Sequence, residues 1–156
     1  KESKLMPSDS LPRLTETRIN HYLNLAHNAC YYSDFMKARL GAVLVYKGKV
    51  ISVGWNSNKT SPLQRELNRY RGYDVDSSIV RNTLHAEVAC LIKAKNLDID
   101  WGRANIFVYR IKKDGSAGLS RPCKGCMTFI KSLGIKNIYY TTLDGYAHEI
   151  IESDTK

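Results

Sequence analysis

The stretch TLHAEVACLIKAK, residues 83–95, has the apolar spacing of a buried helix but opens with two titratable side chains. Its apolar positions, three or four residues apart, are Leu84, Val88, Leu91 and Ile92. This spacing predicts a helix over about 84–96 that packs one face against a core. His85 and Glu87 stand near its start, where a plain core helix would carry leucine or alanine. The polar pair therefore indicates a functional site at this end of the helix.

A second stretch, SRPCKGC at residues 120–126, carries side chains that can complete such a site. Cys123 and Cys126 are three residues apart, so on a helix both sulfurs lie on one side, within reach of a single ion. Pro122 predicts that they occupy a first helical turn, where the helix dipole favours the metal-binding thiolate. A lone C-x-x-C pair also fits a redox pair or half of a zinc ribbon, and a matching histidine makes it specific.

The remaining pattern predicts an α/β protein. Helices are expected over about 15–32, around LQRELNRYR at 63–71, over 122–133, and in YAHEIIES at 146–153. Strands are expected in a hairpin over 40–56 that turns at Lys47-Gly48, in ANIFVYRI at 104–111, and in IKNIYYTT at 135–142. Since strands alternate with helices in the second half, we expect crossover connections and a sheet covered on both faces. The polar stretch 57–82 is long for a compact domain, which indicates a functional or mobile segment.

His85 also lies at a helix start, so it can join the two cysteines. If both helices follow neighbouring parallel strands, their N-termini reach the same edge of the sheet. One histidine and two cysteines supply three ligands, whereas a closed structural zinc site has four and a catalytic site leaves one position to water. Glu87 is expected beside that water as a proton carrier. Positions i and i+2 diverge on a regular helix, so we predict His85 at the non-helical entrance and Glu87 in the first turn.

Size and charge narrow the class of protein. The 156 residues fit one domain, expected over 15–156 after a flexible lead-in at 1–14. The net charge is +9, and residues 103–136 hold eight Lys/Arg against one acid, Asp114. This basic field favours an anionic partner such as nucleic acid or a phosphorylated small molecule, although a basic surface kept for solubility is an equally good interpretation.

The cysteines indicate a reducing compartment. With no apolar run of membrane-spanning length and no secretory segment, the four cysteines are expected to be reduced thiols in the cytoplasm, without a membrane partner. Cys30 and Cys90 are expected to be buried core residues rather than ligands. Tyr70 and Tyr73, which lie among arginines, are candidates for a lid or for a phosphate and base contact.

HAE at 85–87 followed by PCKGC at 122–126 resembles the H-x-E…P-C-x-x-C signature of the zinc-dependent cytidine and deoxycytidylate deaminases. GWN at 54–56 is similar to the strand-end asparagine of the nucleotide and tRNA-editing branches. The resemblance spans about 19–142. It implies a three-layer α/β/α cytidine-deaminase-like fold with a mixed, about five-stranded central sheet and both zinc-bearing helices on one face.

The resemblance also implies roles for individual residues. The expected Zn²⁺ ligands are His85, Cys123 and Cys126, and Glu87 would move protons while a cytosine ring is hydrolysed to uracil and ammonia. The expected substrate contacts are the Ala86 N–H at the pyrimidine carbonyl, Asn56 at the nucleoside, and Trp55, Ser120 and Arg121 around the pocket. Trp55 could instead be a structural residue that packs at the edge of the sheet. Arg121 replaces a residue that is often small in the family, and KKDGSAGL at 112–119 lengthens the preceding loop.

The sequence leaves the substrate open. A free cytosine nucleoside or a nucleotide such as dCMP fits, as does cytosine in single-stranded nucleic acid, and the charge favours a phosphorylated form. Adenine deamination of the tRNA-editing type uses the same ligand set. A zinc-stabilised nucleic-acid-binding module without catalysis is the alternative from another class. The resemblance makes a homo-oligomer an option, since many relatives assemble as dimers or larger rings while polymer-editing ones can act alone.

Overall fold

Five strands form one mixed sheet in the order β2-β1-β3-β4-β5 in the computed structural model, which describes residues 14–72, 74–77 and 81–152. The strands are β1 (Ala38–Tyr46), β2 (Lys49–Trp55), β3 (Asn105–Lys112), β4 (Asn137–Thr141) and β5 (Tyr146–Ile150). Only β3 and β4 are parallel neighbours within these described ranges, and the other neighbouring pairs are antiparallel. The hairpin predicted at Lys47-Gly48 is confirmed as the β1–β2 turn.

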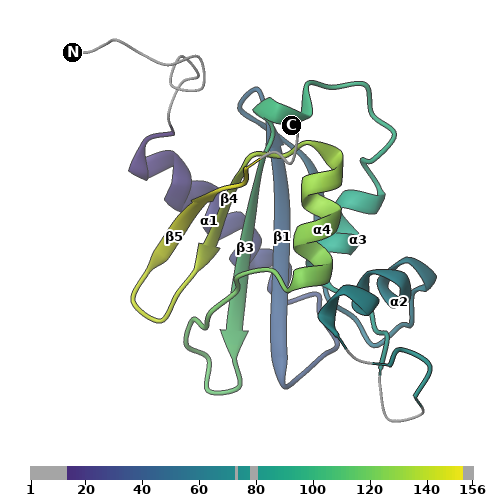
Figure 1. Cartoon of the computed structure of the whole chain (residues 1–156). Coiled ribbons are helices and arrows are strands. Elements are labelled where there is room, and N and C mark those ends of the chain that lie inside the picture. Colours follow the sequence, from purple (N-terminus) through teal and green to yellow (C-terminus); the bar gives the residue numbers. More distant parts are fainter. Residues whose placement is uncertain (1–13, 73, 78–80, 153–156) are drawn as a thin grey trace.

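Helices cover both faces of the sheet, as Figure 1 shows. The helix α1 (Glu16–Cys30) packs on one face, while α3 (Ala86–Ile92) and α4 (Lys124–Leu133) pack on the other. The short helix α2 (Pro62–Asn68) lies against α4 and continues into the 3₁₀ turn η2 (Arg69–Arg71), and a second 3₁₀ turn, η3 (Trp101–Arg103), precedes β3. The predicted three-layer α/β/α fold is confirmed. No described helix has both the length and the apolar character to cross a bilayer.

The first helix forms as its sequence predicts. Thr15 caps it by accepting a hydrogen bond from the Arg18 N–H at 3.2 Å. Four of its buried side chains belong to the cluster on one face of the sheet, and they are Ile19, Tyr22, Leu23 and Ala26. Residues 1–13 of the expected lead-in lie outside the described ranges, and Leu14 packs against this cluster.

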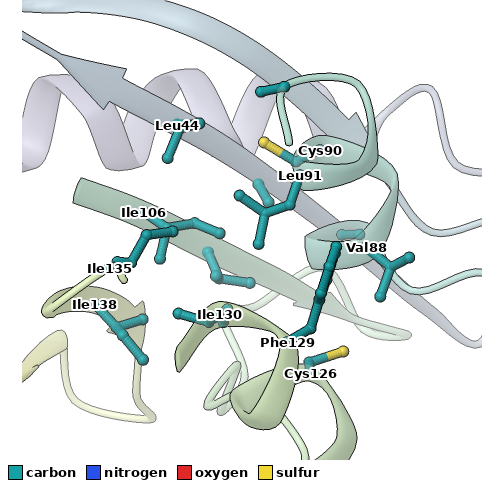
Figure 2. Packing of buried hydrophobic residues seen from close by; sticks show 14 of the residues in the cluster. Leu44, Val88, Cys90, Leu91, Ile106, Cys126, Phe129, Ile130, Ile135 and Ile138 are labelled. Atoms are coloured by element: carbon teal, nitrogen blue, oxygen red, sulfur yellow. The ribbon is translucent and has the colours of Figure 1, made fainter. Parts of the chain in front are cut away.

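The larger core fills the space between the sheet and the helices α3 and α4 (Figure 2). Its largest fully buried side chains come from three strands and both helices, and they include Leu44, Val88, Leu91, Ile106, Ile130 and Ile138. A close backbone contact fixes α3 on this face. A Cβ at Gly54 would lie 2.7 Å from the Ala86 carbonyl oxygen and would strike the Cys90 backbone nitrogen, so a larger residue in β2 would push the helix away.

Two expectations about the fold are wrong. YAHEI forms the edge strand β5, because its backbone pairs with β4 and its alternate side chains face opposite sides of the sheet. The strands before the two site helices, β2 and β3, run in the same direction but are not neighbours, since β1 lies between them. Their carboxyl ends still reach the same edge, because β1 is antiparallel to both.

Candidate metal and catalytic site

As predicted, the helix α3 begins between His85 and Glu87, with His85 at its non-helical entrance and Glu87 in its first turn. His85 is the N-cap residue with extended dihedral angles, φ −86° and ψ 156°, and Ala86 is the first helical residue. The Glu87 side chain is 3% exposed in the first turn. His85 and Glu87 therefore face the same site from two different backbone conformations, which a regular helix would not allow.

The cysteines occupy the corresponding end of α4. Cys123 is its N-cap residue, with φ −70° and ψ 170°, and Cys126 is buried in the first turn. Pro122 thus lies just outside the helix rather than inside its first turn. The Sγ atoms of Cys123 and Cys126 are 3.7 Å and 3.4 Å from the His85 Nδ1 atom.

These three side chains fit a zinc ion. Their ligand atoms all lie within 4.8 Å of one another, and no other described group of three or more His, Cys, Asp or Glu shares this property. In a tetrahedral site with zinc bonds of about 2.3 Å to sulfur and about 2.0 Å to nitrogen, a sulfur and a nitrogen ligand atom would lie roughly 3.6 Å apart. The observed separations match that geometry before any rearrangement, so His85, Cys123 and Cys126 could hold one ion.

Cys90 belongs to the core, as predicted. It is fully buried in the cluster between the sheet and the helices, and burial raises the pKa of its thiol to about 12. Figure 2 shows Cys90 and Cys126 on opposite sides of this cluster. The described metal group therefore has three protein ligands, not four.

Burial and neighbouring thiols shift the protonation of the site. Desolvation raises the pKa of the Glu87 carboxyl, and the nearby His85 partly offsets this effect. The hydrogen bond with Cys126, followed by the one with His85, lowers the pKa of the Cys123 thiol well below its usual range. The same Cys123 contact, together with burial, raises the pKa of Cys126. A carboxyl with a raised pKa thus lies near a thiol with a lowered pKa.

A cavity of about 340 Å³ opens over these residues. His85, Ala86, Glu87 and Cys123 line it on one side. The other lining residues used below are Leu40, Asn56, Arg71, Arg110, Leu119, Ser120 and Arg121. This volume suits a small-molecule ligand such as a nucleotide. The cavity lies at the carboxyl ends of β2 and β3, the sheet edge at which the sequence predicts that the two helix N-termini meet.

Asn56 lines the cavity but also holds the sheet edge together. Its Oδ1 accepts hydrogen bonds from the Ser33 hydroxyl at 2.6 Å and the Leu40 N–H at 2.9 Å. Its Nδ2 donates to the Ala38 carbonyl oxygen at 2.9 Å. Among contacts of the described residues, one Nδ2 hydrogen is left for a ligand.

Trp55 is not among the residues that line the cavity. Its ring lies 5.0 Å from the Tyr32 ring, and the Lys93 ammonium group lies 5.5 Å from its centroid. Tyr32 is 70% exposed, so this aromatic pair forms part of the outer surface at the end of β2. Of the tyrosines considered for a lid, Tyr70 is exposed next to the cavity residue Arg71, and Tyr73 lies outside the described residues.

Ser120 fastens the loop that leads to the cysteines. Its hydroxyl donates to the Val108 carbonyl oxygen at 2.8 Å and accepts from the Thr141 N–H at 2.7 Å. The side chain is 2% exposed, and the Ser120 N–H in turn donates to the Thr141 carbonyl oxygen at 2.9 Å. Ser120 therefore ties the loop to both β3 and β4, immediately before the Arg-Pro-Cys segment.

Arg121 lines the cavity in an ion pair that the sequence did not reveal. Its Nε and Nη2 atoms donate to the two carboxylate oxygens of Glu149 at 2.8 Å each, and the Tyr140 hydroxyl donates to the same carboxylate at 3.1 Å. The hydrogen bond from Arg121 lowers the pKa of Glu149. Glu149 was missed because its segment was expected to be a helix, where it would not lie beside Arg121.

Arg110 is a charged cavity residue that the sequence did not single out as a site residue. It lies at the end of β3, and its Nη1 makes a long contact of 3.4 Å with the Leu119 carbonyl oxygen. Its Nε is buried and has no hydrogen-bond partner among the described residues. A buried N–H left in this state costs about 1–3 kcal/mol.

Comparison with known proteins identifies the class. The family model described as cytidine and deoxycytidylate deaminase zinc-binding region matches residues 16–142. The chain therefore belongs to the cytidine and deoxycytidylate deaminase family, and zinc is the metal that its three-ligand group suits. The predicted membership and cofactor are confirmed. No curated protein matches the sequence.

Solved structures share the fold at low identity. The dCMP deaminase of cyanophage S-TIM5, in its apo form, is 23% identical, with 83% of this chain and 86% of that chain covered and a TM-score of 0.58. Its complex with dCMP and dUMP gives a TM-score of 0.55 at 23% identity, covering 82% and 83%. Cytidine deaminase from Burkholderia pseudomallei is 19% identical, with 88% and 93% covered and a TM-score of 0.59.

Two buried cysteines allow a matched test of the ligand set. Cys126→Ala removes a proposed ligand, whereas Cys90→Ala removes a fully buried thiol outside the metal group. We expect the protein and its Cys90→Ala variant to retain about one zinc per chain after dialysis, and Cys126→Ala to retain almost none, as measured by atomic emission. Circular dichroism establishes that each variant is folded. Stoichiometric zinc in folded Cys126→Ala, or its loss from folded Cys90→Ala, would contradict this ligand set.

Proposed function

We propose that this protein hydrolyses the cytosine of a 5′-phosphorylated nucleotide such as dCMP, forming the uracil nucleotide and ammonia. The observation that carries the proposal is the buried Glu87 carboxyl beside the His85, Cys123 and Cys126 group in a cavity of nucleotide size. Water supplies the oxygen that enters C4 of the ring, and the exocyclic amine leaves with the proton it needs. The reaction consumes no oxidant or reductant.

The metal and the carboxyl have separate tasks. Zinc supplies Lewis acidity, which lowers the pKa of water toward about 7 and makes a nucleophile available at neutral pH. Glu87 accepts a proton from the attacking water, passes it to the ring nitrogen, and protonates the departing amine. Burial raises the pKa of Glu87, which favours a carboxyl that both gains and loses a proton during one cycle.

The cavity also has groups that can orient a pyrimidine. The Ala86 N–H, at the first residue of α3, is proposed to donate to the pyrimidine carbonyl oxygen. Asn56 is proposed to contact the nucleoside through its remaining Nδ2 hydrogen, which makes it a single donor to the ligand. Ser120 is proposed to act through the loop it anchors, whereas Trp55, which does not line the cavity, is not proposed as a substrate contact.

Arginines support a phosphate on the substrate. Arg71, Arg110 and Arg121 all line the cavity, and Glu149 already pairs with Arg121. Arg110 lines the cavity with a guanidinium whose Nη1 makes, among the described residues, only the long contact with the Leu119 carbonyl oxygen, and a phosphate oxygen is a stronger partner for a guanidinium than a neutral hydroxyl. A similar fold occurs in a solved structure of another protein, the cyanophage dCMP deaminase, in complex with dCMP and dUMP.

We further propose that residues 15–156 act as one catalytic domain and that the protein functions in the cytoplasm. The four free cysteines suit a reducing compartment, and two of them are proposed zinc ligands that must stay reduced. Cytosine in single-stranded nucleic acid, adenine in tRNA, and a binding role without turnover are the alternatives. The first experiment below distinguishes them.

Glu87→Gln tests the reaction. Ammonia release is measured on dCMP, deoxycytidine, and single-stranded oligonucleotides containing cytosine or adenine, with and without a chelator. We expect dCMP to react fastest, the chelator to abolish turnover, and Glu87→Gln to lose about 10³-fold or more in kcat while it retains zinc, because both proton transfers lose their carrier. Full activity in the variant would refute Glu87 as the proton carrier. Faster turnover of an oligonucleotide would replace the mononucleotide assignment.

Arg110→Gln tests the phosphate. The lost charge-assisted hydrogen bond, about 1.5–3 kcal/mol, predicts a roughly 10–100-fold higher KM for dCMP. The kcat/KM for deoxycytidine, which lacks the phosphate, is expected to change little. Arg103→Gln is the matched control, since it removes the same charge from an exposed arginine that does not line the cavity. An equal loss on both substrates would show that Arg110 does not bind the phosphate.

A further inference from the structure

The short helix α2 touches both of the turns that carry the proposed zinc ligands. It belongs to the polar stretch 57–82, which the sequence indicates to be functional or mobile and in which it assigns no role to Gln64 or Asn68. Gln64 and Asn68 in this helix are polar yet 0% exposed. Full burial of two neutral amides requires that their hydrogen bonds be satisfied inside the protein.

The first contact reaches the histidine ligand. The Gln64 Oε1 atom accepts a hydrogen bond from the His85 N–H at 3.0 Å. His85 is an N-cap residue, so its N–H lies outside the hydrogen bonds of its own helix. Gln64 supplies that missing acceptor and fixes the extended backbone from which the imidazole faces the two sulfurs.

A row of amides holds Gln64 in this orientation. Its Nε2 donates to Asn68 Oδ1 at 3.0 Å, and Asn68 Nδ2 donates to Asn82 Oδ1 at 3.1 Å. Asn82 Nδ2 then donates to the Val75 carbonyl oxygen at 3.0 Å. Because each amide donates at one end and accepts at the other, the row has one direction, and a flipped Gln64 would place two donors or two acceptors together.

The second contact reaches the cysteine turn. Gly125 lies between Cys123 and Cys126, and a Cβ at this position would come within 2.5 Å of the Leu67 carbonyl oxygen. The backbone of α2 therefore lies directly against the turn that presents both thiols. The contact is independent of the Gln64 hydrogen bond, since it involves another residue of α2 and another helix.

We propose that α2 is the element that positions the metal site, with Gln64 as the positioning residue for His85. The proposal relies on the three-residue metal group of the proposed function, but not on its substrate or its turnover. Outer hydrogen bonds that orient metal ligands commonly change metal affinity by about 10–100-fold when they are removed. A Gln64 variant should therefore release zinc faster than its loss of stability alone explains.

Gln64→Met tests this, because it keeps a side chain of similar length but has no carbonyl acceptor. Ser52→Ala is the matched control: the Ser52 hydroxyl donates to the Cys90 carbonyl oxygen at 2.6 Å, so this change removes a buried hydrogen bond to the same helix α3 away from the ligands. Zinc-loaded proteins are mixed with a chromogenic chelator, and the zinc-release rate is measured beside the thermal midpoint Tm. We expect Gln64→Met to release zinc about 10–100-fold faster and Ser52→Ala to stay within about threefold of the unchanged protein.

Asn82→Ala, at the far end of the amide row, is measured in parallel. This substitution keeps the Gln64–His85 hydrogen bond but removes the Asn82 amide that holds Gln64 in place through Asn68. We therefore expect a smaller increase in the zinc-release rate, of several-fold. Wild-type release rates in both amide variants would overturn the proposal. So would a Ser52→Ala rate that rises as much as theirs, since the effect would then follow general destabilisation of α3. Because no substrate is present, these outcomes are independent of whether dCMP is deaminated.

Discussion

The meeting of two helix N-termini at one sheet edge is the constraint on which the rest of this structure depends. The strands β2 and β3 run in the same direction on either side of β1. The chain leads from β2 through α2 to α3 and from β3 to α4, and α3 and α4 pack on the same face. His85 and Cys123 are the N-cap residues of those helices. Their extended N-cap backbones let the His85 and Cys123 side chains approach each other and Cys126, so that the three donor atoms lie within 4.8 Å of one another.

That arrangement brings a carboxyl and two thiols together, and two of these titratable groups, Glu87 and Cys126, are buried. Burial raises the pKa of Glu87, the hydrogen bond with Cys123 and then burial raise the pKa of Cys126, and hydrogen bonds lower the pKa of Cys123. Buried anionic groups are costly unless a cation compensates them. A divalent ion offsets that cost for the thiolates, and the arginines lining the cavity provide positive charge for an incoming phosphate. The thiolates thus favour the cofactor, and the arginines favour the substrate class proposed here.

The short-range parts of this structure could be predicted from sequence, and the parts set by tertiary contacts could not. Helical periodicity and the spacing of His85, Glu87 and the cysteines identified the site, because they depend on neighbours within one turn. Gln64 and Arg110 gave no such signal, since their roles arise from contacts with segments distant in the chain. The local pattern at β5 predicts a helix, but pairing with β4 makes this segment a strand, and the Glu149–Arg121 pair depends on that pairing.

Zinc-edge X-ray absorption of the purified, zinc-loaded protein tests the central claim most directly, because it counts the atoms around the ion. The account predicts two sulfur ligands at about 2.3 Å and two lighter ligands at about 2.0–2.1 Å, one imidazole nitrogen and one oxygen from solvent. Three or four sulfur ligands would mean that Cys90 or another thiol closes the site, which would leave no position for water. A zinc shell without imidazole would contradict the placement of His85 and, with it, the shared sheet edge as the origin of the chemistry.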